Sequence, residues 1–228
     1  MKLLSLQLGR PRESVSQLKD GKDADWISSI WRTPVDERLH LGRTDLAGNT
    51  QADLKNHGGP DKAVCCYSAE HYPGWRDLLN LREEEFGYGA FGENFTVAEL
   101  TEDAVCLGDI YTLGTATVQV SQPRMPCWKV GRRWERPDLP GEMTKTGRTG
   151  FYLRVLTEGE VGAGDTLTLH ERPVPDCTVA RLNDAMYVQK SDAELAQELS
   201  RLPLLAEAWR RPFRRRAGLL RYKEKEKE

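Results

Sequence analysis

Long hydrophobic runs and an excess charge of one sign are both missing from this sequence. No stretch approaches the roughly 18 consecutive apolar residues of a membrane-spanning helix, so no membrane span is expected. The first residues lack the apolar region and cleavage site of a signal peptide, which predicts a cytoplasmic protein. Lys and Arg number 33 against 35 Asp and Glu, a net charge of −2. A nearly neutral chain offers no general field for nucleic acid or an anionic membrane, so neither is expected as a partner.

The common cofactor and hydrolase signatures are absent too. The sequence contains no GxGxxG dinucleotide fingerprint, no GxxxxGK[ST] phosphate loop and no GxSxG nucleophile motif. A flavin signature and the cysteine spacing of an iron–sulfur cluster are also missing. A nucleotide-binding fold and a Ser-His-Asp hydrolase are therefore not indicated, and the chain shows no route for drawing hydride from a nicotinamide cofactor.

Cysteine is scarce, and its five copies are an odd number. The chain has no CxxC pair and no paired histidines at ligand spacing, so neither a disulfide framework nor a structural zinc site is expected. Cys65, Cys66 and Cys106 lie in short apolar runs, where a thiol acts as a small buried hydrophobic group. Cys177 has no cationic neighbour close by in the sequence.

Cys127 differs from the other four cysteines. It lies between Arg124 and Lys129, on a segment in which two prolines prevent regular helix. Neighbouring cations favour the thiolate form. A thiolate there suits a soft metal ion, nucleophilic attack or redox chemistry, and the spacing alone leaves all three open.

Three further segments contain polar residues among expected strands. His57 precedes a Gly-Gly pair that lets backbone amides approach a ligand, and Lys62 follows at the start of a strand. This combination is suited to binding an anion, and it is equally typical of a glycine-rich turn with a solvated lysine. Asn94 lies between two phenylalanines and either pins its loop or contacts a ligand. Arg148 lies on a loop flanked by glycines and is positioned to close over an anion.

The first part of the chain is rich in short strand patterns separated by Gly, Pro, Asp and Asn. One helix is expected at 69–81, and the polar stretch 10–25 is expected to be a loop. Many short strands with few helices predict a mainly β protein with a closed or nearly closed barrel. The expected strands are 2–8, 62–67, 94–97, 110–113, 116–120, 150–156 and 166–170.

The last quarter of the chain has a different pattern. Three short helices are expected, at 178–187, after Ser191 as N-cap, and from Pro203 through Trp209. They would pack on the barrel or on a second copy of the chain, which would make a homodimer. The expected organisation is a barrel domain at 1–172, a three-helix segment at 173–220 and a charged tail at 221–228.

Several long motifs, taken together and in this order, resemble the MOSC domain, the family related to the C-terminal part of molybdenum-cofactor sulfurases. The three-helix extension is similar to that of the YiiM group within this family. The resemblance implies a MOSC-type β-barrel with a few helices and a small C-terminal three-helix segment. The motifs are QADLKNHGGPDKAV, FGENFT, GDIYTLG, VSQPRMPCWK and TGFYLRVLTEGEVGAGD.

The resemblance also implies a cofactor and an activity. The cofactor is the molybdenum cofactor (molybdopterin), with Cys127 as metal ligand and catalytic residue or as carrier of a persulfide; the family is also associated with pyridoxal phosphate. The implied activity is reduction of small N-hydroxylated bases such as 6-hydroxylaminopurine, with electrons from a separate flavin or iron–sulfur reductase. The alternative is a carrier of cofactor or sulfur. The candidate cofactor-binding residues are His57, Lys62, Asn94, Arg124 and Arg148.

The chain departs from its relatives at one position. Relatives commonly read Gly-Asp-x-Gln before the His-Gly-Gly stretch, where this chain has Gly48-Asn49-Thr50-Gln51. If the aspartate orients a ligand through its charge, that role is neutralised here. No role is therefore assigned to Asn49.

Overall fold

The computed structural model describes residues 1–18 and 25–219. Within these residues the strands are β1 (Lys2–Gly9), β2 (Arg12–Val15), β3 (Asp25–Ser28), β4 (Arg32–Val35), β5 (Leu39–Leu41), β6 (Val64–Ser68), β7 (Phe95–Ala98), β8 (Ile110–Leu113), β9 (Ala116–Pro123), β10 (Phe151–Thr157), β11 (Gly159–Val161) and β12 (Leu167–Glu171). The helices are α1 (Leu54–His57), α2 (Tyr72–Leu79), α3 (Trp128–Arg133), α4 (Leu139–Thr146), α5 (Val179–Tyr187), α6 (Ala193–Ser200) and α7 (Glu207–Arg216), with short 3-10 turns η1 (Pro60–Lys62) and η2 (Ala69–His71).

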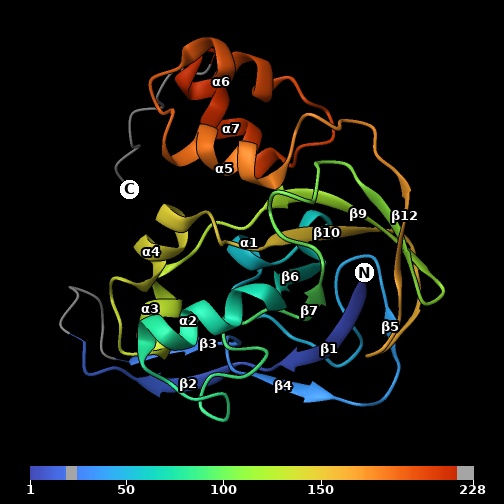
Figure 1. Ribbon diagram of the computed structural model, residues 1–228, viewed down its shortest axis with the longest axis vertical. Helices are drawn as coiled ribbons and strands as arrows, with labels where there is room; N and C mark the ends of the chain where they lie inside the picture. Colours follow the sequence, from blue (N-terminus) through green and yellow to red (C-terminus); the bar gives the residue numbers. More distant parts are fainter. Residues whose placement is uncertain (19–24, 220–228) are drawn as a thin grey trace.

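Eight strands form one strongly curled sheet in the order β12-β8-β9-β10-β6-β7-β1-β4 (Figure 1). All neighbouring strands are antiparallel except β6 and β7. The segment entering β12 returns to β1, where the Leu3 amide donates to the Asp165 carbonyl at 2.9 Å and the Leu167 amide donates to the Met1 carbonyl at 3.1 Å. This pairing brings one end of the sheet, at β12, back to β1, the strand next to the other end. The expected mainly β, barrel-type fold is confirmed.

Apolar side chains at alternating positions fill the inside of the barrel. In β9 the fully buried Val118 and Val120 point inward, and in β1 a register shift between Leu3 and Ser5 lets Leu3 and Leu6, three residues apart, both reach this core. A second core lies outside the barrel, where α2, α3 and α4 pack through aromatic residues such as Trp75 and Phe91. These two cores hold the ends of β6, β9 and β10, from which the loops of the candidate site emerge.

Each of the seven expected strands is present, with bounds that shift by at most three residues. The largest shift is in β9, which runs on to Pro123 because Phe151 of β10 continues to pair with it. The expectation of a loop at 10–25 was wrong for Arg12–Val15, which pairs as β2 with β3; residues 19–24 lie outside the described residues. The expected helix at 69–81 divides into η2 and α2.

Three helices were not foreseen from the sequence, the single turn α1 and the helices α3 and α4. Helices α3 and α4 follow prolines, and the prolines precede or begin them instead of interrupting them. Pro140 occupies the first turn of α4, where its missing N–H has no partner to lose. Pro126 stands just before Cys127, the N-cap of α3.

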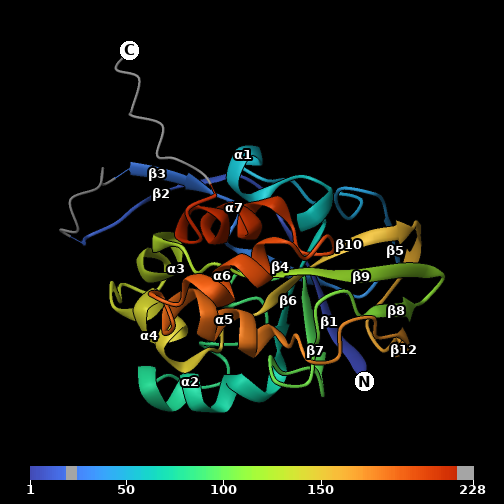
Figure 2. The same cartoon turned by 90° about the horizontal axis from the view of Figure 1, so that it is seen from above.

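The three expected C-terminal helices are present and pack against one end of the barrel (Figure 1, Figure 2). They surround a third core in which Trp209 and Phe213 are fully buried, together with Leu107 of the barrel domain. The N-cap of α6 is Asp192, not Ser191, because the Asp192 carboxylate accepts from the Leu195 amide at 2.8 Å. Helix α7 begins at Glu207 instead of 203, and the tail at 221–228 lies outside the described residues. No helix in the part of the chain that the structure describes is long and apolar enough to cross a membrane.

Candidate functional site

A narrow cavity of about 50 Å³ opens beside the ends of β6, β9 and β10. We call it the inner cavity. Side chains from loops that are far apart in the sequence meet there. Of the six residues expected at a site, five line it: His57, Lys62, Asn94, Arg124 and Cys127.

The loop from α1 to η1 presents His57 and Lys62. Asp53 caps α1 by accepting from the Asn56 amide at 3.0 Å, and the chain then turns through Gly59 at a φ of +98°, which favours glycine. The Lys62 ammonium donates to the Asn56 carbonyl at 2.6 Å, so the lysine is held along its own loop. The Asp53 cap and the turn at Gly59 thus set the path of the loop that carries His57 and Lys62.

Arg124 is the most unusual residue of the inner cavity. Its side chain is only 6% exposed, and one nitrogen, Nη2, donates to the Phe91 carbonyl at 2.6 Å. The other, Nη1, has no hydrogen-bond partner among the described residues. A buried guanidinium with an unused donor is costly unless an acceptor arrives, so this nitrogen points to an anionic ligand.

The electrostatics of the cavity favour a neutral imidazole. Burial, together with the positive charges of Arg124 and Lys129, lowers the pKa of His57 to about 4. Burial also lowers the pKa of Lys62, against the opposing pull of Asp53. At neutral pH His57 therefore presents an uncharged ring that accepts at one nitrogen and donates at the other.

Cys127 lies where the inner cavity meets a second, wider cavity of about 360 Å³. We call this the outer cavity. The thiol is partly exposed, and its backbone is extended, with φ −111° and ψ 160°, immediately before α3 begins. Because Cys127 lines both cavities, a ligand in either of them adjoins its sulfur.

Asn94 both lines the cavity and positions the strand next to it. Its Oδ1 accepts from the Cys65 amide at 3.2 Å, and its Nδ2 donates to the Gln7 carbonyl at 3.3 Å. Both polar ends of the amide are therefore used within the protein. Cys65 is buried as expected, and it also lines the inner cavity, which its apolar sequence surroundings did not indicate.

Two cations of the inner cavity had not been singled out as ligand-binding residues. Lys129 had been noted only as a neighbour of Cys127, and Arg32 of β4 had no local signal. Arg32 donates through Nε to the Gly92 carbonyl at 3.1 Å and through Nη1 to Asn49 Oδ1. The Asn49 amide in turn donates to Asp45 at 2.5 Å. Neutral Asn49, to which no role was assigned, thus holds Arg32 in the cavity wall.

Arg148 does not join the other five residues and lines neither cavity. Its guanidinium lies against α2, where a Cβ at Gly74 would stand 2.9 Å from Nη1. Its backbone carbonyl accepts from the Tyr67 hydroxyl at 3.0 Å. The glycine-flanked loop is held in place instead of closing over the cavity.

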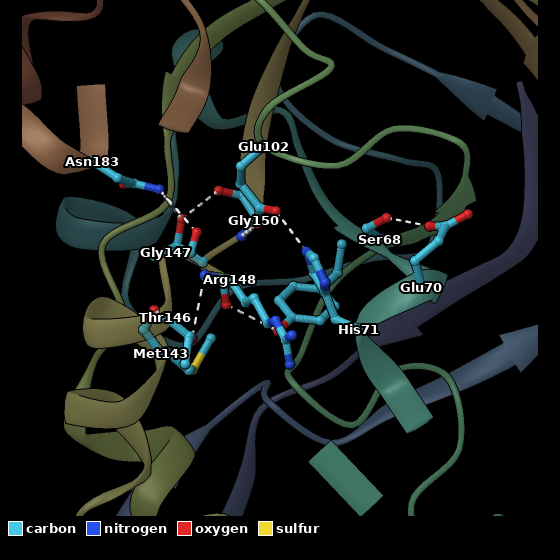
Figure 3. A network of polar contacts seen from close by, with 12 residues as sticks. Ser68, Glu70, His71, Glu102, Met143, Thr146, Gly147, Arg148, Gly150 and Asn183 are labelled. Carbon is cyan, nitrogen blue, oxygen red and sulfur yellow. Dashed lines mark hydrogen bonds and ion pairs between the residues drawn. The ribbon is translucent and has the colours of Figure 1, made fainter. Parts of the chain in front are cut away.

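The network in Figure 3 explains why this loop is held. Glu102 accepts from the Gly150 amide at 2.7 Å and contacts His71 Nε2 at 2.6 Å. Asn183 of α5 donates to the Gly147 carbonyl at 3.1 Å. The Gly150 carbonyl then accepts from the Arg124 amide at 2.9 Å. The network therefore positions the backbone of Arg124, whose side chain lines the inner cavity.

We expect the stability of the protein to fall as the pH drops from 6.5 toward 4. His57 has a pKa of about 4 in the folded protein against 6.5 ordinarily, so the unfolded state binds more protons in this window. The loss from this group is at most about 3 kcal/mol. Urea unfolding of the parent and of His57→Gln between pH 6.5 and pH 4 measures this loss. The difference between their free energies of unfolding should shrink as the pH falls. An NMR titration that gave His57 a pKa near 6.5 would contradict this expectation.

Comparison with known proteins gives consistent results for both parts of the chain. A family model described as MOSC domain matches residues 53–168, and one described as YiiM-like, 3-alpha helix domain matches residues 178–216. The uncharacterized protein YflK of Bacillus subtilis is 41% identical over 96% of this chain and 95% of its own. A protein of Gibberella moniliformis named Reductase is 32% identical over 89% of this chain, which spans only 35% of that longer protein.

A solved structure agrees in fold as well as in sequence. The crystal structure of YiiM from Geobacillus stearothermophilus superposes with a TM-score of 0.78 at 38% identity, covering 94% of this chain and 98% of the other. The superposition therefore extends over both the barrel and the three-helix segment. The chain belongs to the MOSC-domain family, and within it to the YiiM group.

Proposed function

We propose that this protein binds the molybdenum cofactor and reduces N-hydroxylated compounds with electrons from a separate reductase. The observation that supports this most strongly is the pairing of the Cys127 thiol with the unsatisfied Nη1 of buried Arg124 in one cavity. A soft sulfur ligand and an anion-seeking guanidinium side by side suit a cofactor that has a soft metal at one end and a phosphate at the other.

The residues present fit such a cofactor chemically. Arg32, Lys62 and Lys129 join Arg124 around the inner cavity, which gives four cations for a phosphate. Among the described residues, no group of three His, Cys, Asp or Glu could hold a metal ion alone. A metal at Cys127 would therefore take most of its ligands from the cofactor itself. The same cations suit the phosphate of pyridoxal phosphate, the other group that the resemblance associates with the family.

The protein groups have defined tasks in the proposed reaction. When bound, the cofactor would supply a metal centre that accepts two electrons and passes them on to the substrate. Reduction of R–NHOH then consumes those two electrons and two protons and gives R–NH₂ and water. His57 is neutral at pH 7 because of its lowered pKa, so it orients a ligand by hydrogen bonds and does not deliver a proton as imidazolium. Arg124 binds and orients the anionic end.

The proposal is tested by the dependence on an electron donor. Protein made in a cofactor-competent host should show no reduction of 6-hydroxylaminopurine with NADPH alone, since the sequence has no dinucleotide fingerprint. Turnover should appear on addition of a flavoprotein or iron–sulfur reductase, or of a strong artificial donor. Turnover by the purified chain with NADPH alone would refute the need for a partner.

The partly exposed thiol also suits the second function, transfer of sulfur or cofactor through a persulfide on Cys127. Full metal loading without turnover under any donor would favour this carrier. Mass spectrometry of the intact protein would then show the mass of one added sulfur, lost in the Cys127→Ser variant. Assembly with a second copy of the chain stays a prediction under either function.

A further inference from the structure

The outer cavity, which shares Lys62 and Lys129 with the inner cavity, contains an unexplained polar group. Gln122, near the end of β9, lines this cavity and is 2% exposed. Its Nε2 donates to the Pro123 carbonyl at 3.2 Å, which identifies the nitrogen end of the amide. Its Oε1 has no hydrogen-bond partner among the described residues.

An unpaired buried amide oxygen is energetically costly and calls for a physical explanation. Because Oε1 only accepts, its missing partner must bring an N–H or O–H group. The neighbouring Gln119 on the same strand shows the usual situation. Its Oε1 accepts from Arg154 at 3.3 Å and its Nε2 donates to the Gly108 carbonyl at 3.2 Å.

The rest of the outer cavity determines what kind of molecule could bring that donor. Met125, Pro126 and the 37% exposed Trp128 provide apolar and aromatic surface on the Cys127 side. A volume of about 360 Å³ falls within the range for small organic ligands. Aromatic and sulfur-containing walls with a few polar groups are typical of sites for planar rings.

The three-helix segment forms part of the same cavity. Ala208 of α7 lines it. The approach is fixed by the Ala206 amide, which donates to the Ser121 carbonyl at 3.0 Å, directly before Gln122. A small side chain at 208 leaves room for a ligand, so the extension shapes the site in addition to packing on the barrel.

We propose that the outer cavity binds a planar nitrogen heterocycle, with Gln122 Oε1 accepting a hydrogen bond from a ring or amino N–H. Gln122 thereby selects among the N-hydroxylated substrates. That the outer cavity binds such a ring follows from the lining of the cavity alone, whereas the role of Gln122 in selecting substrates rests on the proposed function. Two molecules share this chemistry, a purine-type substrate and the pterin of the cofactor. We assign the outer cavity to the substrate because Arg32 and Arg124, the two arginines that suit a phosphate, line only the inner cavity, whereas Lys62 and Lys129 line both.

The test is ligand binding to the metal-free protein, without electron transfer. Adenine and 6-hydroxylaminopurine are titrated while tryptophan fluorescence is followed, because Trp128 lines the cavity. Gln122→Leu, which removes the acceptor, should weaken binding of both about 10-fold, the value of one buried hydrogen bond. Gln122→Glu, which retains an acceptor, should bind within a few-fold of the parent. Gln119→Leu is the matched control on the same strand and should bind as the parent does.

Two further arms separate the possible occupants. N6,N6-dimethyl-9-methyladenine has no N–H donor and should bind equally to the parent and to Gln122→Leu. In protein loaded with cofactor, Gln122→Leu should retain its molybdenum and pterin content and raise the KM for 6-hydroxylaminopurine with little change in kcat.

Unchanged adenine binding in Gln122→Leu would overturn the proposal, as would an equal loss in Gln119→Leu. Loss of pterin content with unchanged adenine binding would assign the cavity to the cofactor and overturn it as well. Normal purine binding in a protein that reduces nothing would instead refute the proposed function and leave the ring-binding cavity standing.

Discussion

Replacing Cys127 with alanine should remove molybdenum from the protein while leaving its fold unchanged. The thiol is the soft donor at the junction of both cavities, and no cluster of other donors among the described residues could hold the metal in its place. Because the cofactor would supply the other ligands, losing the single protein ligand should weaken metal retention by about 10–100-fold. Elemental analysis of protein from a cofactor-competent host measures this directly.

The fold should survive because Cys127 caps α3 without a side-chain hydrogen bond, so alanine removes no cap. Cys106→Ala is the matched control, since that thiol is buried away from both cavities. We expect it to lower the free energy of unfolding by about 1 kcal/mol and to keep its metal. Cys65 is unsuitable as a control because it lines the inner cavity. Equal molybdenum in Cys127→Ala and the parent would remove the cysteine from the site.

Replacing Arg124 with methionine should weaken cofactor retention by about 100-fold, the upper end of what one charge-assisted hydrogen bond contributes. The reason is the guanidinium Nη1, which is buried and has no partner in the described residues. The ligand-free variant should stay within about 1 kcal/mol of the parent, since losing the bond to the Phe91 carbonyl is offset by removing a buried charge. Pterin and metal content after dialysis, together with urea unfolding, tests both parts.

Arg133 provides the contrast. Its Nη1 donates to the Ile30 and Gly89 carbonyls, both at 2.6 Å, and it lines neither cavity. Arg133→Met should therefore lower the free energy of unfolding by about 2 kcal/mol, because two carbonyls lose their donor. The cofactor content of the folded fraction should not change. If the two variants reversed these patterns, Arg133 and not Arg124 would be the anion-binding arginine.

The strands and most of the cavity residues could be predicted because their signals are local. The seven predicted strands are short runs separated by Gly, Pro, Asp and Asn, and Cys127 lies between cations within a few residues of sequence. His57 before two glycines is equally local. Five of the six proposed residues reach one cavity. Lys62, Asn94 and Arg124 lie within two residues of a strand end, and His57 and Cys127 lie on the segments that connect those ends to a helix. Their roles toward a ligand stay predictions.

The remaining features depend on contacts between distant segments. Arg32 reaches the inner cavity because β4 pairs with β1 in a register that places Leu8 opposite Thr33, and no local pattern encodes that pairing. Asn49 acquires its role only when its amide meets Arg32 and Asp45. Arg148 shows the opposite case, because a loop that is typical of ligand closure is held against α2 instead.

The sequence by itself thus indicated seven of the eight strands of the large sheet, helices α2, α5, α6 and α7, and the chemical groups that are available, because these depend on neighbouring residues. Tertiary structure decided which of those groups share a cavity, which nitrogen of Arg124 and which oxygen of Gln122 lack a partner, and that α7 contributes a wall. These outcomes follow from strand register and from burial. Both are set by packing between residues that are far apart in the chain, so a single segment contains no record of them.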